Sequence, residues 1–164
     1  MKEKPAEIQL GEFIAKFTPE IAELAWEAFA KLQARLPGAV VMVYDNYYAL
    51  VMGFGPTERP SEAFLSIVVY PRWVTLCFLQ GVKLPDPRKI LEGSGKQVRH
   101  LRLENAKTLE EPAIKILISE AVAQASKPLS GKGPGPIIIR LVSAKQRPRR
   151  PEAAAKGNER RTDD

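Results

Sequence analysis

The chain has 164 residues, 45% of them hydrophobic and 27% charged, which is ordinary for a soluble globular protein with one substantial core. No apolar run approaches the ~20 residues that span a membrane, and the charged N-terminus lacks the apolar stretch of a secretory signal. The single Cys77 excludes an internal disulfide and favours a reducing, cytoplasmic setting. The net charge of +6 is uneven: residues 1–127 carry 16 Lys and Arg against 15 Asp and Glu, and residues 128–164 carry 9 against 4.

Two amphipathic helices are predicted at the start of the chain. Apolar residues recur at helical spacing between Ala6 and Phe17, which indicates a first helix with one buried stripe. Thr18 is a suitable N-cap and Pro19 a suitable first helical residue. A second helix is therefore expected from there to about Leu36.

From residue 39 the apolar period becomes that of β-strands rich in Val, Ile and aromatic residues. The predicted strands are Val40–Tyr44, Tyr47–Phe54, Ala63–Tyr70, Trp73–Leu79 and Val98–Leu103. A third helix is expected over Leu109–Ala125, with Thr108 as its N-cap. This order predicts an α+β fold, in which helices pack against a twisted antiparallel sheet of about five strands.

The composition changes after Ser126, where Gly and Pro become frequent. We divide the chain into an α+β domain over residues 1–126, a Gly/Pro linker with a possible edge strand over residues 127–144, and a basic tail over residues 145–164. The tail has no apolar periodicity and is expected to be disordered. The β-prone run Ile137–Val142 can either add an edge strand or pair with a partner chain, for example in a homodimer.

A glycine turn is the first candidate ligand site. Backbone N–H groups of Gly93, Ser94 and Gly95, with the ammonium of Lys96, could hold an anion. The spacing differs from that of a nucleotide-phosphate loop, and a strand follows instead of a helix, so nucleotide hydrolysis is not expected. The pattern favours a structural alternative, a turn that needs two permissive residues.

The strand after this turn carries the second candidate. Strand alternation places His100 and Arg102 on one face, opposite Leu101 and Leu103, which are expected to face the core. Together they could bind an anionic ligand or an acidic partner, because Arg supplies a bidentate donor. The alternative is a solvated strand face. One histidine and one cysteine without spaced partners do not form a zinc site, and no catalytic triad is indicated, so no catalytic residue is assigned.

Carboxylates on the second predicted helix are a weak metal candidate. Glu20, Glu23 and Glu27 recur at three- and four-residue steps and could hold a hard cation through oxygen ligands. The alternative is a solvent-exposed helix face, on which Glu27 and Lys31 form a stabilising pair. Aromatic residues beside basic ones can also stack on single-stranded bases, but strand aromatics more often pack in a core, and core packing is the expectation here.

The basic C-terminal segment is the nucleic-acid candidate. Its cations are Arg140, Lys145, Arg147, Arg149 and Arg150, without an intervening acid. Such a run can neutralise phosphates, and the binding would weaken steeply with salt. Incidental charge for solubility, or contact with an acidic protein or lipid surface, is the alternative.

Four segments resemble the YdhG-like family, a domain of unknown function with some members described as frataxin-like iron chaperones. They are Tyr44–Gly55, Tyr70–Val74, Leu91–Lys96 and Arg99–Leu103, within a similarity that covers roughly residues 8–125. The resemblance implies an α+β fold with helices packed on a twisted antiparallel sheet. It also implies possible iron handling through exposed carboxylates, whereas the segment after Ser126 lies outside it.

Taken together, the residues predict a binding protein more than an enzyme. The expected ligand is a small anion, a metal or a protein partner, bound without catalysis. Nucleic-acid association through the tail and frataxin-like iron delivery are the alternatives. An enzyme would require a deep pocket lined by His100, Arg102 and a carboxylate.

Overall fold

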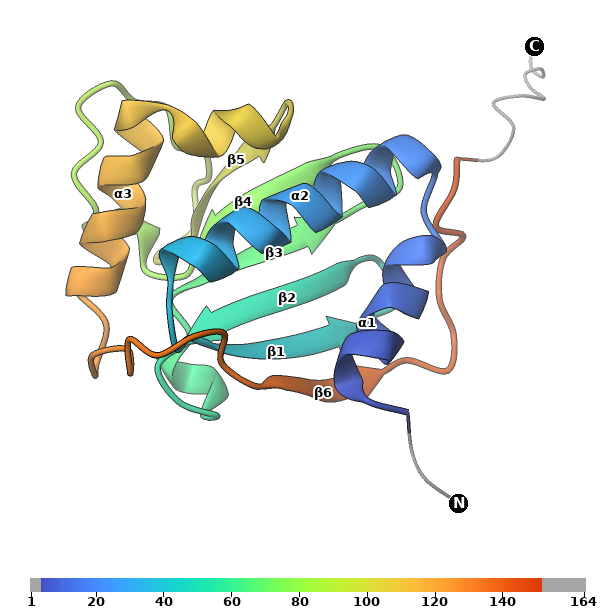
Figure 1. Ribbon diagram of the computed structural model, residues 1–164. Coiled ribbons are helices and arrows are strands. Elements are labelled where there is room, and N and C mark those ends of the chain that lie inside the picture. Colours follow the sequence, from blue (N-terminus) through green and yellow to red (C-terminus); the bar gives the residue numbers. More distant parts are fainter. Residues whose placement is uncertain (1–3, 152–164) are drawn as a thin grey trace, which may run out of the picture.

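The computed structural model describes residues 4–151, which form a layer of helices packed against one face of a single sheet (Figure 1). Helices α1 (Ala6–Ala15) and α2 (Pro19–Arg35) confirm the two predicted N-terminal helices. The Thr18 hydroxyl accepts a hydrogen bond from the Ile21 amide at 3.4 Å, as its predicted capping role requires. No helix among the described residues is long and apolar enough to cross a membrane.

The sheet contains the five predicted strands and one more. Its strands are β1 (Val40–Asp45), β2 (Leu50–Gly55), β3 (Leu65–Val69), β4 (Val74–Phe78), β5 (Arg99–Leu103) and β6 (Ile137–Val142). Their order is β5-β4-β3-β2-β1-β6. All neighbours are antiparallel except β1 and β6, which are parallel.

The observed sheet has six strands and is mixed, because β6 pairs parallel with β1. This corrects the prediction of an antiparallel sheet of about five strands. Of the two roles expected for Ile137–Val142, the structure shows the edge strand. The chain can return parallel to β1 because it first passes through strands β2 to β5 and helix α3, which together supply a long crossover.

The third helix begins later than predicted. Thr108 is not its N-cap but lies inside the short helix η3 (Ala106–Glu110), whose cap is Asn105. Helix α3 (Pro112–Ala123) starts after Glu111, which has extended backbone angles. The reason is steric, since proline disfavours the helical conformation in the residue before it. Two further short helices, η1 (Pro60–Glu62) and η2 (Gly81–Lys83), lie in the loops.

The two faces of the sheet differ in what covers them. Residues paired across the strands on the face under the helices belong to one apolar core with α1, α2 and α3; the central row is Val43, Met52, Ile67, Leu76 and Leu101. The next row points to the other side and consists of Tyr44, Val51, Val68, Thr75 and Arg102. We call this second side the open face, because the helices in Figure 1 pack on the first.

Residues 143–151, here called the C-terminal strap, are packed and not disordered, in contrast to the prediction for this part of the tail. The Arg147 amide donates to the Tyr47 carbonyl at 2.9 Å, and Arg149 is only 5% exposed. The prediction failed because a buried anion, Asp45, holds a segment that lacks apolar residues of its own. Residues 152–164 of the predicted tail lie outside the described part of the chain.

Candidate functional site

An arginine stacked on an exposed tryptophan marks one end of the open face. Thr75 pairs with Arg102 across β4 and β5. Trp73 precedes Thr75 by two residues and therefore lies on the same face. The Arg102 guanidinium carbon lies 4.4 Å from the centroid of the Trp73 ring. The tryptophan remains 37% exposed, so its ring offers a surface to a ligand although one cation already lies over it.

Tyr70 extends this aromatic surface to the neighbouring strand. It closes the β3–β4 turn through a backbone hydrogen bond to Trp73 at 2.9 Å, and the two ring centroids are 5.7 Å apart. Burial, with a smaller contribution from nearby Cys77, raises the pKa of Tyr70. Its hydroxyl is therefore protonated at neutral pH and can donate a hydrogen bond.

A second stack of the same kind lies on the β1–β2 turn. Tyr48 is 62% exposed, meets Tyr47 edge-on with ring centroids 4.8 Å apart, and has the Arg147 guanidinium carbon 5.5 Å from its own centroid. The turns belong to the same end of the sheet, because Leu50 at the end of one pairs with Val69 at the start of the other. Strand spacing places the two stacks on the order of 10 Å apart.

The C-terminal strap holds the second stack in place. Arg149 donates to the Asn46 and Tyr47 carbonyls and to the buried carboxylate of Asp45, at 2.8 Å for the carboxylate. Arg147, two residues earlier, is thereby fixed beside the same turn. The cation over Tyr48 is thus held by the buried Arg149 together with the backbone hydrogen bond from Arg147 to Tyr47.

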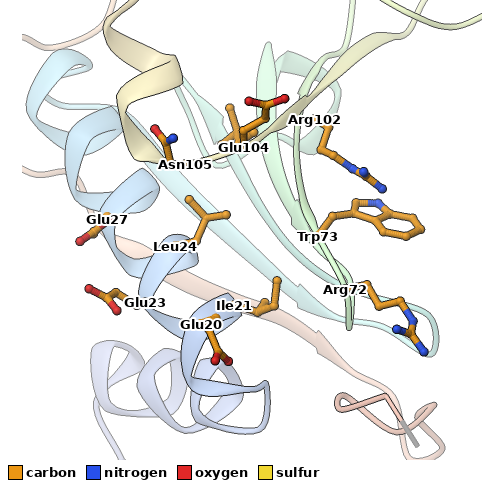
Figure 2. A pocket seen from close by; sticks show the side chains of 11 residues that line it. Glu20, Ile21, Glu23, Leu24, Glu27, Arg72, Trp73, Arg102, Glu104 and Asn105 are labelled. Carbon is orange, nitrogen blue, oxygen red and sulfur yellow. The ribbon is translucent and has the colours of Figure 1, made fainter. Parts of the chain in front are cut away.

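A groove of about 550 Å³ lies between the first half of α2 and the ends of β4 and β5. Figure 2 shows Ile21 and Leu24 extending from α2, with the Trp73 indole and the two guanidinium groups on the side of the strands away from that helix. Its lining is Glu20, Ile21, Glu23, Leu24, Glu27, Arg72, Trp73, Arg102, Leu103, Glu104 and Asn105. The α2 rim is therefore acidic, and the opposite rim combines Arg72, Trp73 and Arg102 with the carboxylate of Glu104.

The groove brings together two sequence candidates that are about 75 residues apart, namely Arg102 and the three glutamates of α2. In Figure 2 the carboxylates of Glu20, Glu23 and Glu27 lie at successive heights along the helix and do not converge on one point. Among residues 4–151 there is no group of three or more His, Cys, Asp or Glu side chains that could hold a metal ion. The proposed metal residues thus form a charged rim in this structure and not a ligand set.

The structure separates the glycine turn from Arg102. Gly93, Ser94, Gly95 and Lys96 precede the first residue of β5, whereas the groove is at its last residue. Only Gly93, with φ +129°, takes a left-handed conformation, so the turn needs one permissive residue and not the two expected. The carbonyl of Gly95 accepts a hydrogen bond from the Arg99 guanidinium at 2.8 Å, which makes Arg99 the support of this turn.

His100 and Arg102 share the open face, as alternation predicts. They nevertheless have different neighbours. His100 Nε2 lies 3.7 Å from the carboxylate of Glu92, on the far side of β5 from β4, and His100 does not line the groove. A carboxylate beside the imidazole disfavours an anion there, so Arg102 is the member of the pair that the structure offers to an anion.

The cations of the basic segment also have separate environments. Arg149 is buried and paired with Asp45, so the prediction that it contacts nucleic acid is wrong; a buried guanidinium that already donates to three oxygens is not offered to a phosphate. Arg140, Lys145, Arg147 and Arg150 are exposed. Of these, Arg150 donates to the carbonyls of α1 and its C-cap, and Arg147 lies over Tyr48.

Sequence reasoning underestimated the aromatic residues. Phe54, Phe64 and Phe78 are in the core as expected, but Trp73 and Tyr48 are exposed. The signal was the neighbouring turns: Tyr48 and Trp73 are at the start of the predicted strands Tyr47–Phe54 and Trp73–Leu79, next to the connections Asp45-Asn46 and Pro71-Arg72. Comparisons with protein-family models, curated proteins and solved structures each found no match.

Proposed function

We propose that this protein binds single-stranded nucleic acid on the open face, without catalysing a reaction on it. The observation that carries the proposal is the exposed Trp73 with Arg102 stacked 4.4 Å from its ring centroid, beside Tyr70 on an open sheet. Single-strand binders combine such aromatic platforms with cations that follow the phosphates. The Tyr48–Arg147 stack gives a second platform at the same end of the sheet.

Charge supports this choice of ligand. Arg72, Arg102 and Arg147 are exposed cations at this end, and no ion pair to a described residue neutralises them. A stacked arginine keeps guanidinium N–H groups for phosphate oxygens while its plane covers an aromatic ring. Bases and phosphates therefore both find partners within one surface, which a simple inorganic anion would use only in part.

The test is a fluorescence anisotropy titration of a labelled 12-nucleotide single strand at several salt concentrations. We expect binding that weakens with salt, and a Trp73→Ala variant that binds about 5- to 150-fold more weakly, the loss of one base–aromatic stack. Arg102→Ala should also reduce the slope of log K against log salt by about 0.7, the value for one phosphate on a single strand.

Matched controls separate this surface from general charge. Trp26→Phe changes the other tryptophan, which lines a different cavity, and Arg88→Ala removes an exposed cation elsewhere. Both should bind like the parent protein. Polyglutamate of equal charge should compete poorly, because it cannot stack. Binding that Trp73→Ala and Arg102→Ala leave unchanged, or equal competition by polyglutamate, would contradict the proposal.

Truncation after Gly135 is not a suitable test, because it removes β6 and the C-terminal strap with their bonds to β1 and Asp45. Point variants of exposed side chains avoid that loss of structure. Arg147→Ala tests the second platform, and we expect a smaller decrease in affinity than for Trp73→Ala because the Tyr48 ring remains.

Membership of the YdhG-like family is a separate proposal, supported by the resemblance of residues 8–125 alone. The turn and strand that carry it, Leu91–Lys96 and Arg99–Leu103, adjoin the open face at β5. If the family and the function belong together, a second YdhG-like protein with an exposed aromatic residue before β4 should bind the same labelled strand.

A further inference from the structure

A second groove, separate from the one beside Trp73, lies between the loop that follows η2 and the start of α3. It has a volume of about 430 Å³ and shares no lining residue with the first groove. Figure 1 shows this yellow-green loop beside α3. Its apolar lining includes Pro85, Pro87, Ile90, Pro112, Ile116 and Leu117. A cavity of this size with mostly apolar walls is typical of a small-molecule site.

The protein itself leaves part of this apolar lining uncovered. Ile116 is 58% exposed, whereas Leu117, the next residue of α3, is buried. Ile90, from the loop, is half-buried and packs against the core. None of the described residues that line the groove is aromatic, so its apolar walls are aliphatic. An aliphatic ligand there would shield Ile116 from water and gain affinity with each methylene group that it buries.

The loop is fixed in its conformation before any ligand binds. Both oxygens of the Asp86 carboxylate accept backbone hydrogen bonds, from the Ile90 and Leu91 amides, each at 3.0 Å. The Lys89 amide donates to the Asp86 carbonyl, also at 3.0 Å, and Lys89 takes a left-handed conformation with φ +55°. These bonds hold the loop in place, and a preformed wall loses little conformational freedom when a ligand binds.

The charge available to a ligand in this groove is positive. Asp86 and Arg88 are the charged residues of the lining, and the Asp86 oxygens are already engaged by the loop backbone. Arg88 is exposed and forms no ion pair with any residue in the range 4–151. Its planar guanidinium group matches a carboxylate through two parallel hydrogen bonds.

We propose that this groove binds a small aliphatic carboxylate. The hydrocarbon chain lies against Ile90, Ile116 and Leu117, and the carboxylate pairs with Arg88. Neither group alone would define the ligand, because a chain without an anion leaves Arg88 unpaired and an inorganic anion leaves the aliphatic walls in water. The site is independent of the proposed single-strand binding and adds a second class of ligand.

The experiment is isothermal titration calorimetry of the full chain with octanoate, octanol and octylamine, which share one hydrocarbon chain and differ in charge. We expect one octanoate per chain, with octanol bound up to about fivefold more weakly, the range of an exposed ion pair, and octylamine weakest. Between hexanoate and octanoate, each added methylene group should strengthen binding about fourfold while the groove can still bury it.

Two variants separate the two parts of the site. Arg88→Gln should lower the affinity for octanoate to that for octanol and leave octanol binding unchanged. Ile116→Ser should weaken both ligands alike, and it should fold because this side chain is mostly exposed. Arg140→Gln and Val142→Ser, an exposed cation and a 50% exposed valine on β6, are the matched controls and should bind like the parent protein. Circular dichroism checks that each variant is folded.

The outcomes also distinguish this site from the nucleic-acid site. Trp73→Ala should leave octanoate binding unchanged, so a failure of single-strand binding does not affect this inference. No saturable heat with octanoate would overturn it, as would octylamine bound as tightly as octanoate. Octanoate affinity that Arg88→Gln leaves unchanged would overturn it too, because the carboxylate would then not pair with Arg88.

Discussion

Arg149 and Asp45, 104 positions apart in the chain, form a buried ion pair in which Arg149 Nη2 donates to Asp45 Oδ1 at 2.8 Å. Lys16 donates to the other carboxylate oxygen at 2.9 Å. The pair joins the C-terminal strap to the β1–β2 turn and to the end of α1, so three distant segments meet at one carboxylate.

Removing the cation from this pair should destabilise the fold. Arg149→Met leaves Asp45 buried with Lys16 as its only charged partner, and we expect a loss of about 3 kcal/mol in the free energy of unfolding, measured in urea. In a double variant, Asp45→Asn with Arg149→Met, the loss should be smaller than the sum of the two single losses, because neither charge is then left alone. Additive losses would show that the two groups do not interact.

The same carboxylate makes stability depend on pH. Burial acts to raise the pKa of Asp45, but hydrogen bonds from Lys16, Gln146 and Arg149 together outweigh it and hold the pKa below its ordinary value. A lowered folded-state pKa stabilises the fold above the unfolded value of about 3.9, and this contribution is lost as the pH falls through the folded value. Urea unfolding at acid pH should show this loss, and Asp45→Asn should flatten the curve; a parallel curve would contradict it.

Gly135 allows the chain to pass close to β1. A Cβ atom there would lie 2.6 Å from the Ala39 carbonyl carbon and 2.9 Å from the Gly38 carbonyl oxygen. Gly135→Ala should therefore displace the start of β6 and cost about 1–3 kcal/mol of stability. Gly95→Ala, where no atom lies within 4 Å of the added carbon, is the control and should change stability little.

Cys77 should react slowly with thiol reagents in the folded protein. It lies on the open face between Ser66 and His100, and burial raises the pKa of its thiol, although a hydrogen bond with Ser66 acts in the opposite direction. The reactive thiolate is therefore scarce at neutral pH. We expect Ellman's reagent to label it more slowly in the native state than in urea; equal rates would mean that the side chain is free in solution.

Local sequence patterns were sufficient for most elements of the fold. Thr18 with Pro19 marked the start of α2, and the period-two runs around Val43, Ile67 and Leu76 marked strands, because capping and pleating depend on residues close together in the chain. Alternation also placed Arg102 opposite the core. The start of α3 was misjudged because Pro112 acts on Glu111 more strongly than Thr108 acts as a cap.

The candidate site depended on contacts that no local pattern encodes. Sequence placed Arg102 on a strand and Glu20 on a helix, but their meeting in one groove follows from the packing of α2 beside the ends of β4 and β5. Likewise, the sequence predicted Arg149 to be one cation in a polar tail, because the local sequence around it does not indicate an anion 104 residues away. Burial of Asp45 strengthens its attraction to Arg149, and only the assembled core creates that burial.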